Sequence, residues 1–549
     1  METRTPSAAF ALSRRNLFQL GIVGGALAAA PLAAKYPLGF THGVASGEPG
    51  PSSVLLWSRY AAGQPTTLRW EVSQDDSFRK VVAGGTVLAT PDHDWCVKQV
   101  AENLEPDSWY YFRFIAPDGS TSCTGSTRTL PVGSVDSFRM AVVGCSNKGF
   151  GWFNAYAHIA EQGDFDLVLH TGDYLYEYPV GTYPSAAEAL AGRKLDPAHE
   201  IIALADYRAR YANYRTDPDL QRLHQLYPML HVPDDHESAN DSYALGAENH
   251  DPATEGPWEA RKRAAIRARL EWLPVSDDPW AAYEIGDLAT LFRLETRLTA
   301  RTKPFDLGQI MRRGGGDPAR TIAALEAFRD GEWRDPSHTL MGEIQEDWLA
   351  KGFETSRRSG KTWQVLLQQV IMANLRSSGD IAEGMTDAVP DYLRQRIRAG
   401  VLNSKVGLPF NMDAWDGYPA ARERLLQSAQ EADANLIVLA GDSHNAWASE
   451  LDNAGAAAGI EFAGHSVSSP GFEGYLGWVP PEKLAAQSVA ENPQLKWAET
   501  GHRGYMAIEL TPQRATAEYR FLETVRSRTT ALAGTKRITS SAGSQALDI

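Results

Sequence analysis

The stretch that decides the fold is Asp166-Leu-Val-Leu-His-Thr-Gly-Asp-Tyr-Leu-Tyr-Glu177. Its apolar residues predict a buried strand that stops at Gly172, and Asp173 and Tyr176 follow. In α/β enzymes a ligand is bound at the carboxyl edge of a parallel sheet, where such a carboxylate is presented. A second copy of the arrangement, Leu436-Ile-Val-Leu-Ala-Gly-Asp-Ser-His444, carries a histidine instead of the tyrosine. Together the two copies indicate a metal-binding hydrolase.

Composition sets the size and excludes one class of partner. With 549 residues, 43% hydrophobic and 22% charged, the chain is long enough for two or more domains. The formal net charge of −15 argues against a surface that binds nucleic acid, because such a surface is basic. An acidic protein can still bind phosphate, since metal ions invert the local field.

Residues 1–34 are interpreted as an export signal rather than as part of the fold. Ser13-Arg-Arg-Asn-Leu-Phe18 has the twin-arginine pattern, and a mild apolar run rich in Gly and Ala follows it. That run is short for a membrane span, which needs about 20 apolar residues. We expect the twin-arginine export machinery as a partner, a periplasmic or secreted location, and no integral span in the mature chain. The alternative is an N-terminal anchor or a cytosolic tail.

The mature chain divides into three parts. Residues 35–132 contain short β-branched and aromatic runs separated by turns, which predicts an all-β, immunoglobulin-like sandwich. Residues 136–525 are predicted to form the catalytic domain, and 526–549 a loosely held tail. Two of the three cysteines, Cys96 and Cys123, lie in the sandwich region, and whether they pair is left open.

The second part alternates predicted strands and helices, which favours a parallel sheet with helices on its faces. Segment 377–405 is interpreted as a surface excursion or a lid. The predicted strands are 138–143, 165–170, 229–232, 289–294, 363–368 and 436–440, and the helices include 152–161, 258–273 and 342–353.

Polar residues follow four of these strands directly, and we expect them along one edge of a parallel sheet. One Gly-Asp after a strand is weak evidence, because Asp is common in turns, but four such ends in order are much stronger. The four are Val143-Gly-Cys145, Gly172-Asp173-Tyr-Leu-Tyr176, His231-Val-Pro-Asp234-Asp235-His236-Glu237 and Gly441-Asp442-Ser-His444.

This series resembles the calcineurin-like metallophosphatases, and more closely the family of PhoD-type alkaline phosphatases and phospholipases D. Cys145 stands in the first family motif, Tyr176 replaces the second Asp of Gly-Asp-x-x-Asp, and Asp442 replaces the first His of Gly-His-x-His. The stretches Phe40-Thr-His-Gly-Val-Ala-Ser-Gly-Glu48 and Trp415-Asp-Gly-Tyr418 are also similar to the family. The resemblance implies that an α/β, four-layer sandwich of mixed sheets flanked by helices follows the N-terminal β domain in the sequence.

Two metal sites follow from the ligand types. Thiolate, phenolate and imidazole suit a transition metal, above all Fe(III), while oxygen-only sites favour Ca²⁺ or Mg²⁺. The resemblance implies iron plus calcium, with zinc or magnesium as alternatives. Asp234 is either a further ligand or the residue that orients His236. The predicted ligands are Cys145, Asp173, Tyr176 and His444 for the first ion, and Asp235 with Asp442 for the second, where Asp234 is the further candidate.

Several of these residues also have purely structural interpretations. Cys145 could be a small buried hydrophobe and Asp173 a helix cap. Tyr176 could be a core residue, because Tyr174 and Tyr178 flank it and only one of the three can be the ligand.

The predicted reaction is hydrolysis of a phosphate ester by a metal-activated hydroxide. His236 is the candidate to contact phosphate or protonate the leaving group, and Arg297 the candidate to clamp a phosphate oxygen in a bidentate contact. The main prediction is an alkaline phosphatase that acts on phosphomonoesters, with diesters as further substrates. The alternatives are a phospholipase D-like phosphodiesterase on the same scaffold and a noncatalytic β-sandwich protein that binds surfaces or carbohydrate. A purple iron-tyrosinate phosphatase is disfavoured by Asp442 and by Gln368–Gln369.

Overall fold

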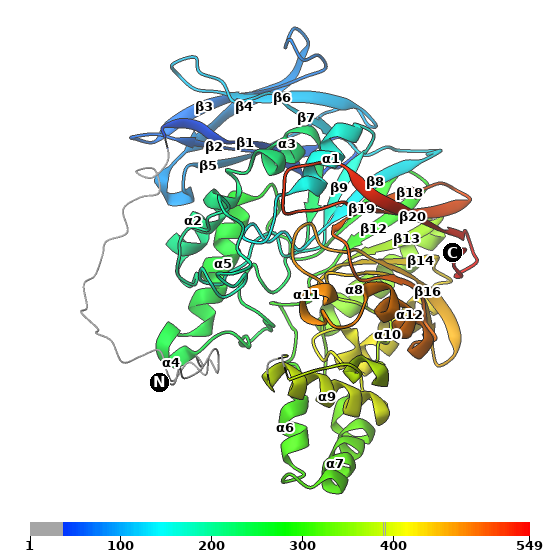
Figure 1. Ribbon diagram of the computed structural model, residues 1–549. Coiled ribbons are helices and arrows are strands. Elements are labelled where there is room, and N and C mark those ends of the chain that lie inside the picture. Colours follow the sequence, from blue (N-terminus) through cyan, green and yellow to red (C-terminus); the bar gives the residue numbers. More distant parts are fainter. Residues whose placement is uncertain (1–36, 388, 390) are drawn as a thin grey trace, which may run out of the picture.

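The computed structural model describes residues 37–387, 389 and 391–549, so the predicted export signal lies outside the described residues. Two large sheets pack face to face, and helices cover their outer faces (Figure 1). Apolar side chains such as Leu169 from one sheet and Ile437 from the other are buried between them. The predicted fold class, a layered sandwich of mixed sheets flanked by helices, is confirmed.

The first sheet has nine strands, and its centre is parallel: residues of four neighbouring strands pair in the same direction. The two central strands of this run, Leu167–His170 and Pro228–His231, are fully buried, as parallel sheets covered on both faces require. In spatial order the strands are β20 (Leu532–Ser541), β19 (Arg514–Leu522), β18 (Gly504–Leu510), β8 (Phe138–Val143), β9 (Leu167–His170), β10 (Pro228–His231), β1 (Gly39–Gly47), β2 (Val54–Ala61) and β5 (Cys96–Ala101).

The second sheet has seven strands, of which β12, β13, β14 and β16 run parallel. The polar strand ends therefore do not lie along one sheet edge, as predicted, but at the matching ends of two facing sheets. Strand positions alone could not reveal this, because each sheet has its own run of parallel strands. In order the strands are β11 (Ala281–Ile285), β12 (Ala289–Arg293), β13 (Trp363–Leu367), β14 (Leu436–Ala440), β16 (Ala456–Ala463), β15 (Ala446–Asn453) and β17 (Leu495–Glu499).

The N-terminal β region is joined to the large sheet. Its own four-stranded sheet, blue at the top of Figure 1, packs Trp70 and Phe112 against Val44, Leu56 and Val97 of β1, β2 and β5. Because β1 pairs with β10, one layer of the N-terminal sandwich continues the nine-stranded sheet across the predicted domain boundary. The four strands, in order, are β4 (Val81–Ala89), β3 (Thr66–Ser73), β6 (Trp109–Ile115) and β7 (Gly125–Arg128).

The cysteines form no disulfide within the described residues. Cys96 is buried beside Trp57 and Trp272 on the nine-stranded sheet, whereas Cys123 is exposed just before β7 of the other sheet. Because Cys96 and Cys123 lie on different layers, they do not form a disulfide with each other.

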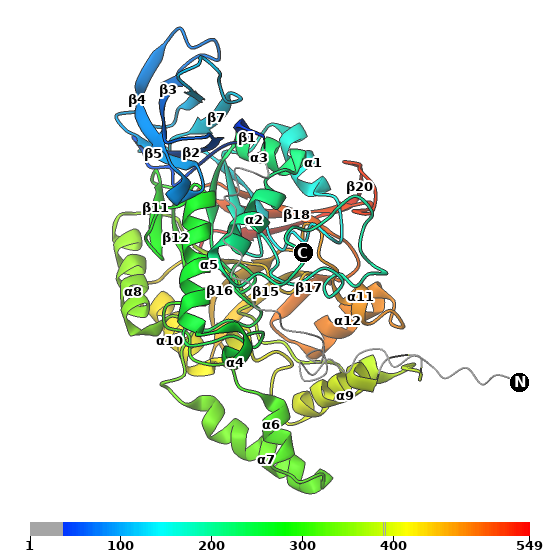
Figure 2. The same ribbon diagram turned by 90° about the vertical axis from the view of Figure 1, so that its left-hand side faces the viewer.

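The helices cover the outer faces. On the nine-stranded sheet lie α1 (Asn154–Gln162), α2 (Leu204–Tyr214), α3 (Pro218–Leu226) and α5 (Trp258–Trp272); on the seven-stranded sheet lie α8 (Gly342–Arg358), α10 (Pro419–Glu431) and α12 (Pro481–Glu491). Away from the N-terminal sheet, Figure 2 shows α6 (Leu307–Arg312), α7 (Pro318–Asp330) and α9 (Asp391–Lys405). The remaining helices are α4 (Pro252–Glu255), α11 (Phe472–Tyr475) and the short 3-10 turns η3 (Pro91–His93), η4 (Glu332–Arg334), η5 (Gly379–Ala382) and η6 (Trp415–Gly417).

The prediction of a loosely held tail over 526–549 is wrong, because β20 pairs with β19 from Arg514↔Ser541 to Leu522↔Leu532. β20 is an edge strand whose buried apolar anchor is Ile538. Charged residues such as Lys536 are typical of protected sheet edges and concealed the strand in the sequence.

Candidate metal centre

The predicted ligands lie together where the parallel strands of both sheets end. Cys145 follows β8, Asp173 follows β9, and Asp234 follows β10 of the nine-stranded sheet. Asp442 and His444 follow β14 of the seven-stranded sheet. Side chains more than 260 residues apart in sequence thus share one buried site, in three overlapping groups whose ligand atoms lie within 4.8 Å of one another.

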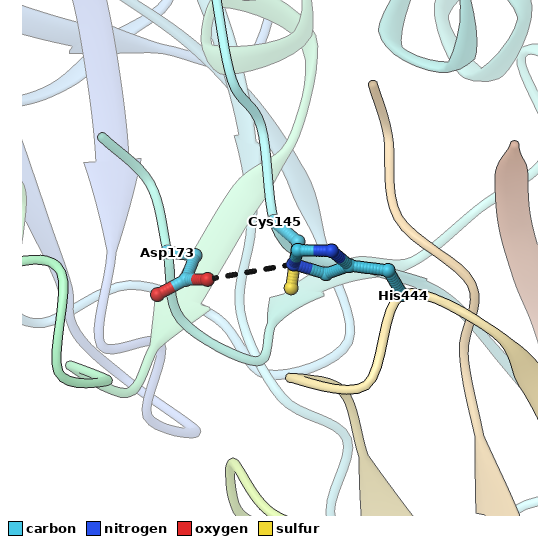
Figure 3. Close-up of side chains that lie close together, drawn as sticks. All are labelled: Cys145, Asp173 and His444. Atoms are coloured by element: carbon cyan, nitrogen blue, oxygen red, sulfur yellow. Dashed lines mark ion pairs between the residues drawn. The ribbon is translucent and has the colours of Figure 1, made fainter. Parts of the chain in front are cut away.

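The first group joins Cys145, Asp173 and His444 (Figure 3). His444 Nε2 lies 3.9 Å from Asp173 Oδ2. His444 Nδ1 donates a hydrogen bond to the carbonyl oxygen of Pro470 at 2.8 Å, which fixes the tautomer and leaves Nε2 free to bind a metal. The side chain is therefore presented as a ligand before any ion arrives.

Tyr176, rather than either neighbouring tyrosine, completes this group. Its hydroxyl lies 2.9 Å from Asp173 Oδ2 and 3.2 Å from His444 Nε2. The Tyr174 hydroxyl contacts a histidine in the core, and the Tyr178 hydroxyl donates to an asparagine. The structure therefore distinguishes the three tyrosines that the sequence could not separate.

The second group consists of the carboxylates of Asp234, Asp235 and Asp442. The two oxygens of Asp235 accept hydrogen bonds from the backbone N–H groups of His236, at 3.0 Å, and Asp241, at 2.6 Å. Asp234 Oδ2 is buried without a hydrogen-bond partner among the described residues. Asp234 is thus at least as available to an ion as Asp235.

The backbone at the site is held in an uncommon conformation. Cys145, Asp173, Asp442 and His444 have φ values of 56°, 55°, 59° and 61°. Non-glycine residues rarely adopt this left-handed region, which costs about 1–2 kcal/mol each. Such strain persists where the surrounding structure enforces it, and it is typical of functional sites.

Glu237 ties the two loops of the nine-stranded sheet together. Its Oε2 accepts hydrogen bonds from the backbone N–H groups of Asp173, at 3.2 Å, and Asp234, at 2.6 Å, and its Oε1 from that of Tyr174, at 2.5 Å. The imidazole nitrogen Nε2 of His231 lies 3.5 Å from Glu237 Oε1 and makes no hydrogen bond to a described residue. The main role of Glu237 is to fix the backbone that presents two of the candidate ligands.

The electrostatics of the site call for a cation. Burial raises the pKa of Asp173 and of Asp234 well above the usual range, and raises the pKa of Asp442 to about 7. Burial and the nearby carboxylates also raise the pKa of the Cys145 thiol. Burial lowers the pKa of His444 to about 3, so this imidazole is neutral, as a ligand must be.

The donor set fits metal ions. Asp173 Oδ1, like Asp234 Oδ2, is buried and lacks a hydrogen-bond partner in the described part of the chain. Buried carboxylates without partners are costly unless a cation neutralises them. One group offers sulfur, phenol and imidazole, and the other only oxygens, so the site can hold two ions of different character.

Arg297 does not lie as a free phosphate clamp, contrary to the prediction. Its Nε donates to Asp234 and its Nη1 to Asp413, each at 2.5 Å. Only Nη2 has no hydrogen bond to a described residue, and it lies 3.8 Å from Asp235 and 3.6 Å from Asp442. A bidentate grip on phosphate through Nη2 and a second nitrogen would break at least one of these buried ion pairs, so Arg297 neutralises the carboxylates instead.

His236 is held by Glu177, whose Oε2 lies 2.7 Å from Nδ1. Burial alone disfavours the imidazolium form, but three neighbouring carboxylates outweigh it and raise the pKa of His236 well above its usual range. These carboxylates therefore favour the protonated form of His236.

The sequence reasoning missed four residues that shape the site: Glu177, Asp241, Asp413 and Ser469. Ser469 donates to the Tyr176 hydroxyl at 2.7 Å. The Ser469-Pro-Gly471 stretch is similar to the family and could have pointed to Ser469, whereas no motif marks the other three residues. The side-chain oxygens of Gln368 and Gln369 accept hydrogen bonds from Trp415 Nε1 and Thr296 Oγ1, respectively.

A two-sheet sandwich with clustered metal ligands at its strand ends defines the metallophosphatases. Within that class the chain belongs to the PhoD-like phosphatase family, whose model matches residues 140–519; the model for the family's N-terminal domain matches 26–131. The predicted resemblance is confirmed. The chain is therefore a phosphatase that acts on phosphoric esters with the help of metal, and the noncatalytic alternative is not supported.

Two relatives show how far the likeness extends. Alkaline phosphatase D of Bacillus subtilis (strain 168) is 33% identical over 520 residues, covering 90% of this chain and 79% of that protein. A solved structure described as "Structure of PhoD" matches with a TM-score of 0.75 and 29% identity, covering 93% of this chain and 92% of the other. The likeness thus spans both the N-terminal β region and the catalytic region.

Proposed function

We propose that this chain is an alkaline phosphatase that hydrolyses phosphomonoesters, and phosphodiesters as further substrates, at a centre that holds Fe³⁺ and Ca²⁺. The observation that carries the proposal is that two of the three overlapping donor groups in one buried site, Cys145/Asp173/His444 and Asp234/Asp235/Asp442, differ in character. A site for a single type of ion would not need a thiol and a phenol on one side and only carboxylates on the other.

Cys145, Asp173, Tyr176 and His444 would hold the iron, and Asp234, Asp235 and Asp442 the calcium. When bound, such ions supply Lewis-acid stabilisation of charge on phosphoryl oxygens and lower the pKa of water. Zinc or magnesium would require the same residues to be ligands, but phenolate ligation favours Fe³⁺ at the first position.

The protein's own residues support three further tasks. His236, protonated and oriented by Glu177, is the proton donor to the leaving alkoxide. Arg297 pairs with Asp234 and Asp413 and so balances their charge beside the substrate. Glu237 keeps the backbone of Asp173 and Asp234 in register without touching substrate.

Export through the twin-arginine machinery, to the periplasm or the outside of the cell, belongs to the same proposal and rests on Ser13-Arg-Arg-Asn-Leu-Phe18. Among the described residues, no helix has the length and apolar character that crossing a membrane requires. Replacing Arg14 and Arg15 by lysine should retain the protein in the cytoplasm, which cell fractionation would detect.

The deciding experiment is metal analysis and a visible spectrum of the purified mature protein, with Tyr176→Phe compared with Tyr174→Phe. We expect iron, calcium and a phenolate-to-iron absorption band that Tyr176→Phe abolishes. Tyr174→Phe also removes a buried hydroxyl, but one that contacts His224, and it should keep the colour. A zinc-only protein, or an unchanged spectrum in Tyr176→Phe, would refute the iron assignment. Rates on a monoester and a diester of the same alcohol measure the substrate preference.

A further inference from the structure

We propose that a cavity beside the metal centre is a leaving-group subsite for alcohols that combine an apolar body with a second anionic group. The proposal rests on the proposed function, because it assigns one part of the same substrate. The cavity has a volume of about 440 Å³, and Asp413 and Asp442 form part of its lining. A phosphoester held at the oxygen-donor side of the centre would therefore place its alcohol in this cavity.

Much of the cavity wall is apolar, and three helices contribute to it. Ile397 of α9, Phe472 of α11 and Leu484 of α12 line it, and the same helices pack together in one small apolar cluster. Figure 2 shows α9 on the side of the molecule next to α11 and α12. Segment 377–405, predicted as a surface excursion or a lid, thus forms a wall of the cavity. The volume of the cavity lies within the usual range for sites that enclose small organic molecules.

Two arginines, Arg376 and Arg396, add positive charge to this apolar lining. Both are exposed, and within the described residues neither guanidinium has a hydrogen bond or an ion pair. Arg394, on the same helix as Arg396, pairs instead with Asp387 and Asp391. In a chain with a net charge of −15, two unpartnered arginines in one cavity stand out.

The position of Arg376 is fixed by its backbone. Its N–H donates to Asn492 Oδ1 at 2.7 Å, and its carbonyl oxygen accepts from Asn492 Nδ2 at 3.1 Å. The next residue is tied to α9, because the N–H of Ser377 donates to Ser404 Oγ at 2.8 Å. The loop that carries Arg376 and the helix that carries Arg396 are therefore held against each other.

These features select a substrate class. Guanidinium groups recognise carboxylates and phosphates through charge-assisted, often bidentate, hydrogen bonds. The carboxylates of Asp413 and Asp442 in the lining repel an anion, whereas the two arginines attract one. The best substrate is thus a phosphate ester whose alcohol has an apolar body and carries a second anionic group.

The test compares phenyl phosphate with 4-carboxyphenyl phosphate on the metal-containing enzyme. In the double variant Arg376→Ala/Arg396→Ala, kcat/KM for the carboxylated ester should fall at least about 10-fold, from the loss of charge-assisted hydrogen bonds. For phenyl phosphate it should change by less than about twofold, since no charged contact is lost. Arg398→Ala, which removes an exposed arginine of α9 outside the cavity lining, is the matched control and should change neither value.

Calorimetric binding of 4-carboxybenzyl phosphonate and benzyl phosphonate separates this proposal from the proposed function. The subsite is supported if wild type binds the carboxylated phosphonate more tightly and the double variant loses that preference. This binding result stands even if neither ester is hydrolysed and the proposed function fails. If both esters are hydrolysed but the double variant affects them equally, or not at all, the subsite is refuted while the phosphatase remains. Equal binding of the two phosphonates by wild type would also overturn the subsite.

Discussion

Gly172→Ala tests whether the loops of the centre are as closely packed as the structure requires. Gly172 precedes Asp173 and has a φ of 105°. A Cβ atom there would lie 2.4 Å from Asp234 Cβ and 2.9 Å from the Asp234 backbone nitrogen. The substitution therefore pushes apart the two loops that present Asp173 and Asp234, and the obstacle is largely backbone, which cannot move aside cheaply.

The magnitude has two parts. An alanine in the left-handed region costs about 1–2 kcal/mol, and overpacking against a rigid neighbour adds about 1–3 kcal/mol. The expected loss in free energy of unfolding is thus about 2–5 kcal/mol. Shifting residues that support metal ligands commonly lowers metal affinity about 10- to 100-fold.

The chain offers a matched control in Gly163→Ala. Gly163 ends α1 with a φ of 71°, and an added Cβ would meet no atom within 4 Å. It should show the backbone cost alone, about 1–2 kcal/mol, with full metal content. Urea denaturation and metal analysis of both variants give the comparison. If Gly172→Ala were as stable and as rich in metal as Gly163→Ala, the close packing of the two loops would be wrong.

Two further perturbations probe the buried charges. Arg297→Met leaves Asp234 without its cation and should destabilise the chelator-treated protein by about 3–5 kcal/mol; the loss should be smaller with metal bound, because the ions replace the lost charge. Arg293→Met, which breaks an ion pair with Glu48, is the control and should lose the same stability with and without metal. If Arg297→Met also lost equal stability in both states, its role in balancing charge at the metal centre would be wrong. Burial raises the pKa of Asp416 to about 7. The folded state then binds the proton more tightly than the unfolded state, so up to about 4 kcal/mol of stability is lost as pH rises from about 4 to about 7. Between pH 5 and pH 8 the free energy of unfolding should fall less in Asp416→Asn than in wild type, as denaturation at both pH values would show. The same pH dependence in both proteins would contradict the burial argument.

Local patterns predicted much of the fold. The strands 138–143 and 436–440 coincide with β8 and β14, because a fully buried parallel strand is a short continuous apolar run. β20 was missed, since an edge strand needs few apolar residues. The assignment of strands to two sheets was also missed, because pairing depends on contacts between distant segments.

The candidate site divides in the same way. Cys145, Asp173, Asp442 and His444 could be selected from the sequence because each follows an apolar run closely. The roles of Arg297 and Glu177 could not, because they depend on which distant carboxylate or imidazole lies within hydrogen-bond distance.

The sequence by itself determined the residue types at the strand ends, and through them the family and the class of chemistry. Only the tertiary structure decided that two facing sheets supply the ligands, that Tyr176 rather than Tyr174 or Tyr178 reaches Asp173, and that Arg297 is already paired. The physical reason is that propensity and periodicity depend only on residues that are close together in the sequence. Coulombic and hydrogen-bonding contacts within a buried site instead depend on distances that the packing of whole layers sets.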